Sequence, residues 1–469
     1  MPSMSVRSRE IGVRRMEQGP NGPPDVSVPA MTRRRLIRAL TLFVASCVLV
    51  ARGGYAAEWV HDGIVTPQAK ALITLLKSAE LYGLRTQDYL IPDIDPDESS
   101  HPPGTGFDTL MDAAAMRFLQ HVHFGRIDPS RSGFDLQFIR PPLPWNTVLA
   151  DLASSADVGA FVGRLEPPFE HYRLLRRALA RYRSLMAGQA TPTPVELQSV
   201  PYDRRVRQIE LTLERWRWLP AFNSPPIIVN IPEFRLFAFS STQDRKADIL
   251  QMDVIVGRTH PELRTPVFAA DLRYIIFRPY WDIPRSITER EMLPQIRAKP
   301  DFLSRQHLQL VAGPGDSAPV VAPGPQSIED LAAGKLRLRQ EPGPDNALGL
   351  IKFMLPNRYD VYLHSTPAHA LFGQRRRAFS HGCIRVSDSV ALAEYALRNA
   401  TGTWTAQAIT AAMNGSETLR VNLKTPIRVL ILYGTALATE DGAVQFFDDI
   451  YGHDRRLEAL LGLQPVSSR

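Results

Sequence analysis

Cysteine is scarce in this sequence: among 469 residues only Cys47 and Cys383 are present. Two cysteines exclude a fold stapled by several disulfides and a zinc site built from several thiolates. The first 30 residues are rich in proline, glycine and arginine and lack the apolar periodicity of a folded domain. Translation from Met31 is therefore the alternative start.

Apolar runs of membrane-spanning length are also lacking. The run at 39–51 has 13 residues, short of the roughly 20 that a helix needs to cross a bilayer. It follows the basic segment 32–38 and precedes small residues at 54–57, the layout of a cleavable secretory signal. We predict export, with an uncleaved N-terminal membrane anchor as the alternative. Cleavage would leave Cys383 alone, and a thiol kept in an oxidising compartment indicates either a reactive group or a buried inert one.

A basic surface is lacking once the leader is set aside. The net charge is +7, but the first 57 residues carry nine arginines against Glu10, Glu17 and Asp25, a net of +6, which leaves +1 for the rest. Nucleic-acid binding requires a basic face that stays with the folded protein. We therefore predict no nucleic-acid partner.

The apolar spacing changes along the chain. Helical spacing at 69–84, 110–122 and 171–186 is followed by a Thr-Pro-rich linker at 187–201 and a helix from 203 to about 218. Beyond that point short β-branched and aromatic runs predict strands, at 227–231, 235–239, 252–256, 273–277, 359–364 and 427–433. The pattern predicts an α+β protein that is helical first and mainly β afterwards.

The most informative segment contains two histidines and a thiol, from His364 to Cys383. A free thiol is mostly protonated at neutral pH unless an imidazole or a helix N-terminus lowers its pKa. Gly382 lets the chain turn so that consecutive backbone N–H groups can converge on one point, as an oxyanion hole requires. Spacing alone does not decide whether His364 or His381 is the base.

Two other interpretations of this segment stay open at this point. His364, His381 and Cys383 could be three ligands of a zinc ion, although no second thiolate remains and their spacing fits no usual zinc pattern. They could also be core histidines beside a buried cysteine. Their coincidence with Gly382 and an export signal favours catalysis, and we predict neither a metal nor another cofactor.

The same segment resembles the signature of the L,D-transpeptidase (YkuD-like) catalytic domain, a histidine followed by Ser/Thr-His-Gly-Cys. His364 and the run from Ser380 to Cys383 match it. The chain is similar in particular to the large Gram-negative periplasmic subfamily, at 213–220, 254–258, 279–284, 342–349 and, in its scaffold domain, 124–129. One departure is the lack of a peptidoglycan-binding module before 213–220, where only the short linker stands.

The resemblance implies that Cys383 is the nucleophile and His364 its base. It also implies that backbone N–H groups of His381, Gly382 and Cys383 stabilise the oxyanion and that Ser380 hydrogen-bonds an imidazole. We rank these supporting roles below the Cys-His pair.

Two arginines near the motif are candidate ligands of the substrate. Arg385 follows Cys383 by two residues, and Arg377 precedes it by six. Either is expected to meet a carboxylate of the stem peptide, with a structural ion pair as the alternative.

The implied reaction is formation of 3-3 cross-links in peptidoglycan. Cys383 would take the acyl group of a tetrapeptide stem as a thioester, release D-Ala, and pass the acyl group to an amine of a second stem in the periplasm. Carbapenem-type β-lactams are expected to acylate the same thiol. An L,D-carboxypeptidase that trims stems, and a non-catalytic wall-binding scaffold protein, are the alternatives.

These expectations give a domain plan. A leader at 1–57, with its signal at about 31–57, precedes a helical scaffold domain at 58–190 and a linker and helix at 191–225. The catalytic domain follows at 226–436, with a proline-rich capping loop at about 287–340 that is too long for a simple connection. A C-terminal extension at 437–469 completes the plan, and oligomeric state and acceptor are not readable from the sequence.

Overall fold

The structure is a computed structural model, and it describes residues 57–464 apart from 91–93, 95–105, 137, 139, 200, 241–248 and 399. The predicted export signal and Cys47 lie outside the described residues. Within the described part, no helix combines the length and the apolar character needed to cross a membrane. Residues 56–469 form one compact unit.

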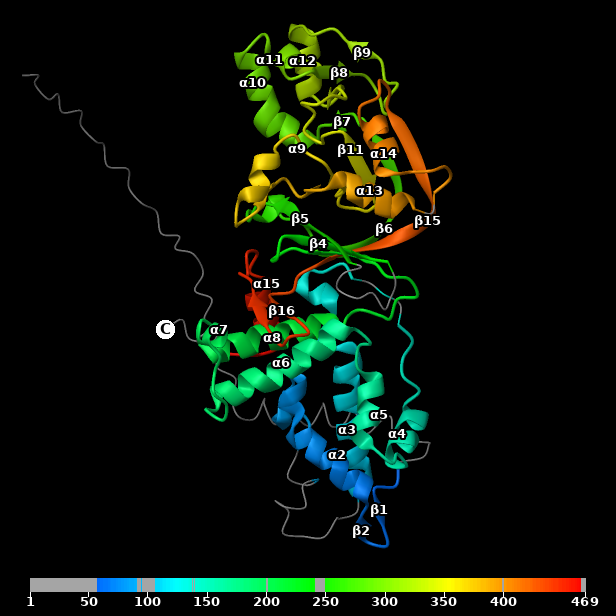
Figure 1. Cartoon of the computed structure of the whole chain (residues 1–469), viewed down its shortest axis with the longest axis vertical. Coiled ribbons are helices and arrows are strands. Elements are labelled where there is room, and N and C mark those ends of the chain that lie inside the picture. Colours follow the sequence, from blue (N-terminus) through cyan, green and yellow to red (C-terminus); the bar gives the residue numbers. More distant parts are fainter. Residues whose placement is uncertain are drawn as a thin grey trace, which may run out of the picture. The chain divides into compact units, whose positions relative to one another are not determined.

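The N-terminal region is helical, as the apolar spacing predicts (Figure 1). Thr66 caps its first helix by accepting a hydrogen bond from Ala69 N, and Pro67 occupies the first turn, where it costs no hydrogen bond. A buried cluster that includes Leu72, Phe118 and Val162 holds the helices together. The elements are β1 (Val60–His61), β2 (Ile64–Val65), α2 (Pro67–Lys77), η1 (Ala79–Tyr82), η2 (Thr86–Asp88), α3 (Phe107–Phe124), η4 (Pro129–Ser132), α4 (Trp145–Ala153) and α5 (Val158–Leu165).

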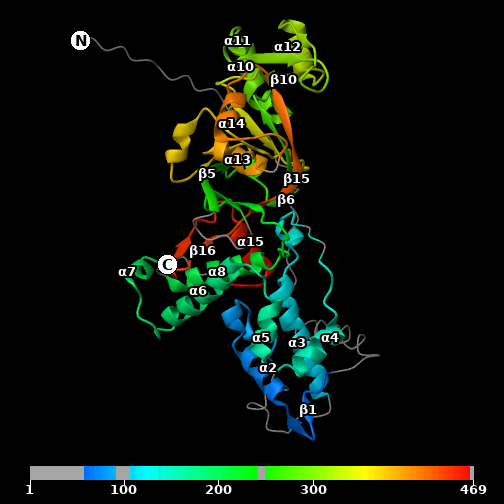
Figure 2. The same ribbon diagram turned by 45° about the vertical axis from the view of Figure 1, so that its right-hand side comes forward.

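Two longer helices, α6 (Glu170–Met186) and α8 (Tyr202–Trp216), lie side by side (Figures 1 and 2). Their apolar faces share one cluster, in which Leu175 and Leu179 of α6 join Ile209 and Leu213 of α8. The segment predicted as a linker between domains therefore joins two helices that share a core, and it contains the short α7 (Pro194–Leu197). The C-terminal β16 (Ala436–Ala438), β17 (Val444–Phe446) and α15 (His453–Leu460) also follow this arrangement, since α6 and α8 contact β16 and α8 contacts α15.

The end of α8 is joined to the helical region through a buried carboxylate. Glu214 is fully buried and accepts hydrogen bonds from the backbone N–H groups of Arg126 and, at 3.1 Å, Ile127. The buried Arg217 lies 3.4 Å from the same carboxylate and donates to Tyr172 at 3.0 Å. A buried carboxylate is tolerated only with such partners. The segments 124–129 and 213–220, which resemble family motifs, thus contact each other.

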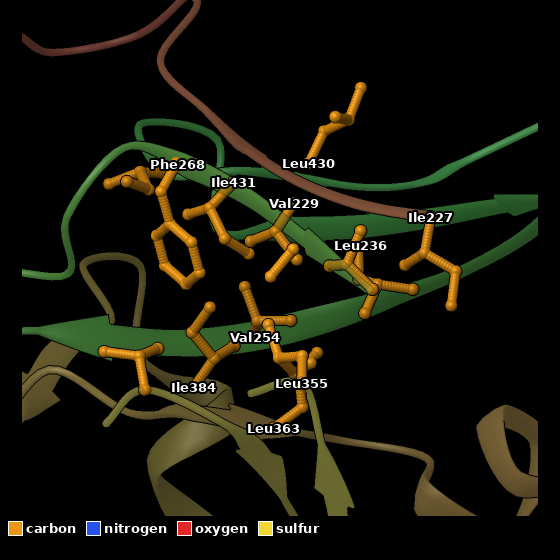
Figure 3. Packing of buried hydrophobic residues seen from close by; sticks show 14 of the residues in the cluster. Ile227, Val229, Leu236, Val254, Phe268, Leu355, Leu363, Ile384, Leu430 and Ile431 are labelled. Carbon is orange, nitrogen blue, oxygen red and sulfur yellow. The ribbon is translucent and has the colours of Figure 1, made fainter. Parts of the chain in front are cut away.

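The main sheet has nine strands in the order β13-β5-β14-β12-β11-β6-β15-β3-β4, and a further pairing of β4 with β5 closes it. Its interior is filled by alternating apolar side chains. Val229, Leu236, Val254, Ile384 and Ile431 come from five strands and point toward one another in Figure 3. The strands are β3 (Ile227–Asn230), β4 (Arg235–Phe239), β5 (Ile249–Gly257), β6 (Phe268–Phe277), β11 (Ile351–Met354), β12 (Leu363–His364), β13 (Ala378–Ser380), β14 (Ile384–Val386) and β15 (Leu419–Leu432). Two helices, α13 (Ser389–Leu397) and α14 (Ala406–Met413), follow β14.

The segment 287–340, predicted as a long capping loop, is folded into helices and strands, so the prediction of a loop is wrong. The segment folds with its own sheet, β7-β10-β8-β9, and its own buried cluster, which includes Leu293, Leu310 and Leu338. Pro325 lies in the first turn of α12, and Pro294 directly follows the π-helical turn η7 inside the continuous helical run 285–298, so both prolines belong to helical structure and not to a loop. We call this part the insertion. Its elements are β7 (Trp281–Asp282), α9 (Arg285–Ile287), η7 (Thr288–Met292), α10 (Leu293–Ala298), α11 (Phe302–Arg305), β8 (Leu308–Val311), β9 (Val320–Val321), α12 (Pro325–Ala332) and β10 (Arg337–Gln340).

Candidate active site

His364 is the last residue of the short strand β12, which lies between the strands β11 and β14. It pairs with Lys352 of the antiparallel strand β11 and with Arg385 of the parallel strand β14. The apolar residues of these strands, such as Phe353, Leu363 and Ile384, belong to the core cluster. Because side chains alternate along a strand, His364 and its two partners lie on the opposite face.

Cys383 immediately precedes β14 and continues the same arrangement. Ile384 N donates to Tyr362 O at 3.0 Å, and Ile384 is paired with Leu363, so Cys383 lies opposite Tyr362. Tyr362 precedes His364 by two residues and therefore lies on the same face of the sheet. The side chains of Cys383 and His364 therefore share one face on neighbouring strands, as diagonal neighbours. Such neighbours are about 7–8 Å apart at the backbone, within reach of long side chains.

The turn before Cys383 needs a glycine. Gly382 has φ +116°, a backbone conformation that side-chain-bearing residues rarely adopt. The Ser380 hydroxyl accepts from Gly382 N at 3.2 Å and donates to Cys383 O at 2.5 Å. Ser380 thus fixes the turn, and among the described residues no hydrogen bond joins its hydroxyl to an imidazole.

One of the three predicted oxyanion donors is already used, since Gly382 N–H is paired with Ser380. Within the described residues, the backbone N–H groups of His381 and Cys383 have no acceptor. An oxyanion hole needs such free, fixed donors. The geometry therefore favours these two groups over Gly382.

A chain of buried hydrogen bonds holds the turn from behind. Thr265 is fully buried; its hydroxyl donates to Gly382 O and accepts from Gly257 N, both at 2.8 Å. Tyr451 donates to Gly257 O at 2.6 Å. A Cβ on Gly257 would lie 2.1 Å from Leu263 O, so only glycine permits this approach. The family-like segment 254–258 is thus a support for the Cys383 turn.

The thiol faces polar neighbours that the sequence did not single out. Its Sγ lies 3.7 Å from the backbone carbonyl of Asp360, a residue with φ +53°. Tyr362 presents both its hydroxyl and its backbone N–H to the sulfur, which works against the main effect, burial. Burial raises the pKa of Cys383. The thiol is therefore protonated at neutral pH.

The imidazole of His364 is only 4% exposed, and its Nδ1 donates to Ser365 O at 2.6 Å. This hydrogen bond leaves Nε2 as the nitrogen with a free lone pair. Burial, with Arg385 and Lys352 as like-charged neighbours, lowers the pKa of His364 to about 3. The pair is thus a neutral thiol and a neutral imidazole, and within the described residues no hydrogen bond joins them.

The segment 342–349 orients His364 through its neighbour. Gly349 has φ +63°, and a Cβ on it would lie 2.0 Å from Ser365 Oγ. The Ser365 hydroxyl accepts from Leu350 N at 2.9 Å. Asn346 is 1% exposed and donates to Glu341 O at 2.8 Å. The segment 342–349 therefore supports the position of His364, the candidate base.

The two predicted carboxylate ligands differ. Arg377, directly before β13, donates to Asp253 of β5 at 2.9 Å and to Phe234 O at 3.0 Å, so it is held in a structural ion pair. Arg385 lies in the row with His364, and its buried Nε has no hydrogen-bond partner among the described residues. Arg385 is therefore the candidate that keeps a free donor at the site.

His381 is engaged with the insertion. Its Nε2 lies 2.6 Å from a carboxylate oxygen of Glu291 in η7, a π-helical turn of the insertion. Of the two histidines, His364 is therefore the better candidate for the base. In the part of the chain described, no three His, Cys, Asp or Glu side chains gather around a metal position.

Comparison with known proteins agrees with this geometry. Residues 51–179 match the Scaffold domain, and residues 225–428 match the L,D-transpeptidase catalytic domain (YkuD). A curated protein of Haemophilus influenzae named "Putative L,D-transpeptidase" is 31% identical over 252 residues, which are 54% of this chain and 49% of the relative. The chain thus spans about half the length of that relative. On these matches the chain carries an L,D-transpeptidase (YkuD) catalytic domain at residues 225–428, preceded by a Scaffold domain at residues 51–179.

Proposed function

We propose that this protein is an L,D-transpeptidase that acts on peptidoglycan stem peptides, with Cys383 as nucleophile and His364 as general base. The observation that supports it most is the placement of both side chains on one face of neighbouring strands, inside the residues that match the catalytic domain. The free N–H groups of His381 and Cys383 next to the sulfur suit an acyl-transfer reaction.

The first half-reaction starts from the neutral pair. The Cys383 proton passes to Nε2 of His364 as sulfur attacks the carbonyl carbon between the L-centre of meso-diaminopimelate and D-Ala. The C–N bond breaks, and the imidazolium returns the proton to the departing amine. A thioester on Cys383 and free D-Ala are the products.

The second half-reaction reverses these roles. The side-chain amine of another stem attacks the thioester carbonyl and gives a proton to His364 as the C–S bond breaks. A 3-3 cross-link forms, and the imidazolium returns that proton to the sulfur, which restores the Cys383 thiol. Transfer to an amine in preference to water requires a site that limits water. The insertion is suited to that task, because Glu291 contacts His381 beside the nucleophile.

The leader gives the cellular setting of the proposal. An apolar run preceded by basic residues and followed by small ones fits export to the periplasm, where peptidoglycan is found. The protein would act there either released or held by an N-terminal anchor.

Product analysis tests the proposal. Purified residues 58–469 are incubated with disaccharide-tetrapeptide, and the products of the wild type, Cys383→Ala and His364→Gln are compared by mass spectrometry. Cross-linked dimer with D-Ala release in the wild type alone is the expected result. Tripeptide without dimer would replace the proposal by an L,D-carboxypeptidase, and no turnover at all would favour a non-catalytic scaffold protein.

A further inference from the structure

Three polar side chains form a row across three strands of the main sheet. Lys352 of β11 pairs with His364 of β12, and His364 pairs with Arg385 of β14. Neighbouring strands are about 4.8 Å apart, so the two cations flank the imidazole on both sides. We call this set the cation row.

Neither cation of the row is neutralised by an ion pair. Lys352 Nζ lies 3.9 Å from the centre of the Tyr362 ring, and the buried Nε of Arg385 lacks a hydrogen-bond partner. Among the described residues no carboxylate lies within ion-pair distance of either. Both side chains are half-buried. A cation partly removed from water is costly without a counter-charge, which indicates that one is supplied from outside.

The charged groups that reach the row from other elements do not supply it. Cys383 could carry a negative charge toward both cations, but burial raises its pKa and it stays a neutral thiol. Asp282, Asp316 and Asp360 act on Lys352 only at a distance, and Asp282 is already paired with Arg337. Arg258 adds a further positive charge near Arg385. The row as a whole is therefore a site for an anion.

We propose that Lys352 and Arg385 bind the carboxylate of the D-amino acid that leaves, and that this binding makes His364 competent as a base. The inference rests on the proposed function for the identity of the anion. It assigns to Lys352 a positioning and specificity role that the sequence did not indicate.

The chemistry of the leaving group places its carboxylate at the row. The departing amine must come within hydrogen-bond distance of His364 to receive its proton. In an α-amino acid the carboxylate is attached to the carbon that carries this amine. A D-Ala whose nitrogen faces His364 therefore brings its carboxylate to the side chains on either side of the imidazole. The entering amine of meso-diaminopimelate also has a carboxylate on its own carbon and is received in the same way.

The electrostatic consequence couples binding to catalysis. Burial is the largest cause of the lowered pKa of His364, and the two unneutralised cations lower it further. An anion bound between them removes the part due to the cations, so the imidazole accepts the proton of Cys383 more readily when an acyl-D-amino acid is present. In the empty enzyme the only thiol of the described chain stays protonated and poorly reactive.

Titration of His364 tests the coupling without turnover. Cys383→Ala protein with ¹³C-labelled histidine is titrated by NMR, alone, with N-acetyl-D-alanine and with N-acetyl-D-alaninamide, and His364→Gln assigns the signal. We expect the acid to raise the imidazole pKa by about one unit or more and the amide to leave it unchanged. No shift with the acid, or an equal shift with the amide, would overturn the inference.

Substitutions in the row locate the effect. Lys352→Met and Arg385→Met should each raise the pKa of His364 in the empty protein and abolish the response to the acid, while Lys352→Arg keeps the response. Lys424→Met, an exposed lysine of β15, is the matched control and should behave as the parent protein.

Turnover supplies an independent readout. The wild type should prefer a donor stem that ends in D-Ala over its C-terminal amide by tenfold or more in kcat/KM, and Lys352→Met should lose that preference while still processing the amide. A retained preference in Lys352→Met contradicts the inference. If D-Ala release is absent but the NMR response is present, the proposed function fails and the anion site stands. If D-Ala is released but the acid gives no NMR response, the proposed function stands and the anion site fails.

Discussion

The buried hydroxyl of Thr265 should control both stability and catalysis, because it is the link between Gly257 N and Gly382 O, each at 2.8 Å. Thr265→Val keeps the shape of the side chain but leaves one buried donor and one buried acceptor unsatisfied. Each such group costs about 1–3 kcal/mol, so we expect a loss of roughly 2–6 kcal/mol in the free energy of unfolding. Thr265→Ser keeps the hydroxyl and should lose only about 1 kcal/mol for the missing methyl group.

Urea unfolding measures the stability change, and the rate of D-Ala release measures the effect on the Cys383 turn. A turn displaced by an ångström can cost up to about a hundredfold in rate, so we expect Thr265→Val to be slower by about ten- to a hundredfold. Thr425→Val, at an exposed position of β15, is the control and should stay within about 0.5 kcal/mol of the wild type. If Thr265→Val and Thr265→Ser lose the same stability and activity, the hydrogen-bond chain has no role in holding the nucleophile.

Three further predictions follow from the same geometry. Gly349→Ala should destabilise the protein by about 2 kcal/mol or more in urea unfolding, because φ is +63° and the new Cβ would meet Ser365. Gly343→Ala, with open space around it, is the control and should be neutral. Equal losses in the two variants would refute the close approach of Gly349 to Ser365. Glu291→Gln should raise the ratio of tripeptide to dimer products by loosening the contact with His381, and an unchanged ratio would remove the insertion from the control of water. Burial lowers the pKa of His364 to about 3, so the folded state holds this imidazole neutral while the unfolded chain protonates it below about pH 6.5. The free energy of unfolding is therefore highest above about pH 6.5 and falls by up to about 1.4 kcal/mol per pH unit as the pH drops toward 3. The wild type should therefore lose about 2 kcal/mol more than His364→Gln between pH 6.5 and 5, while His61→Gln, an exposed control, should follow the wild type.

The fold class and the placement of the candidate Cys-His pair were accessible from the sequence because their signals are local. Period-2 alternation identified β3 and β4 almost to the residue, and 3.6-residue spacing identified α3 and α6. The two strands that carry the pair, β12 and β14, are short, and there the motif and not the periodicity was informative.

What the sequence did not show depends on long-range pairing. Lys352 becomes part of the site only because β11 pairs with β12 in one register, and a shift of one residue would turn it to the other face. Glu291 meets His381 across 90 residues. Asp360 acts through its backbone carbonyl, so its side chain gave no signal.

The insertion was misjudged for a different reason. A run of prolines indicates a loop, but Pro325 starts a helix and Pro294 lies inside the helical run 285–298. The apolar residues of the insertion are spread over elements too short for a clear periodicity. The N-terminal leader, the periplasmic location and the domain boundaries stay predictions.

The central claim is that Cys383 carries the acyl group during the reaction. Intact-protein mass spectrometry of wild type incubated with disaccharide-tetrapeptide, without an acceptor amine, tests it most directly. The account predicts an adduct with the mass of the disaccharide-tripeptide acyl group, located on the peptide that contains Cys383 and missing from Cys383→Ala. Release of D-Ala without such an adduct, or with an adduct on another residue, would contradict it.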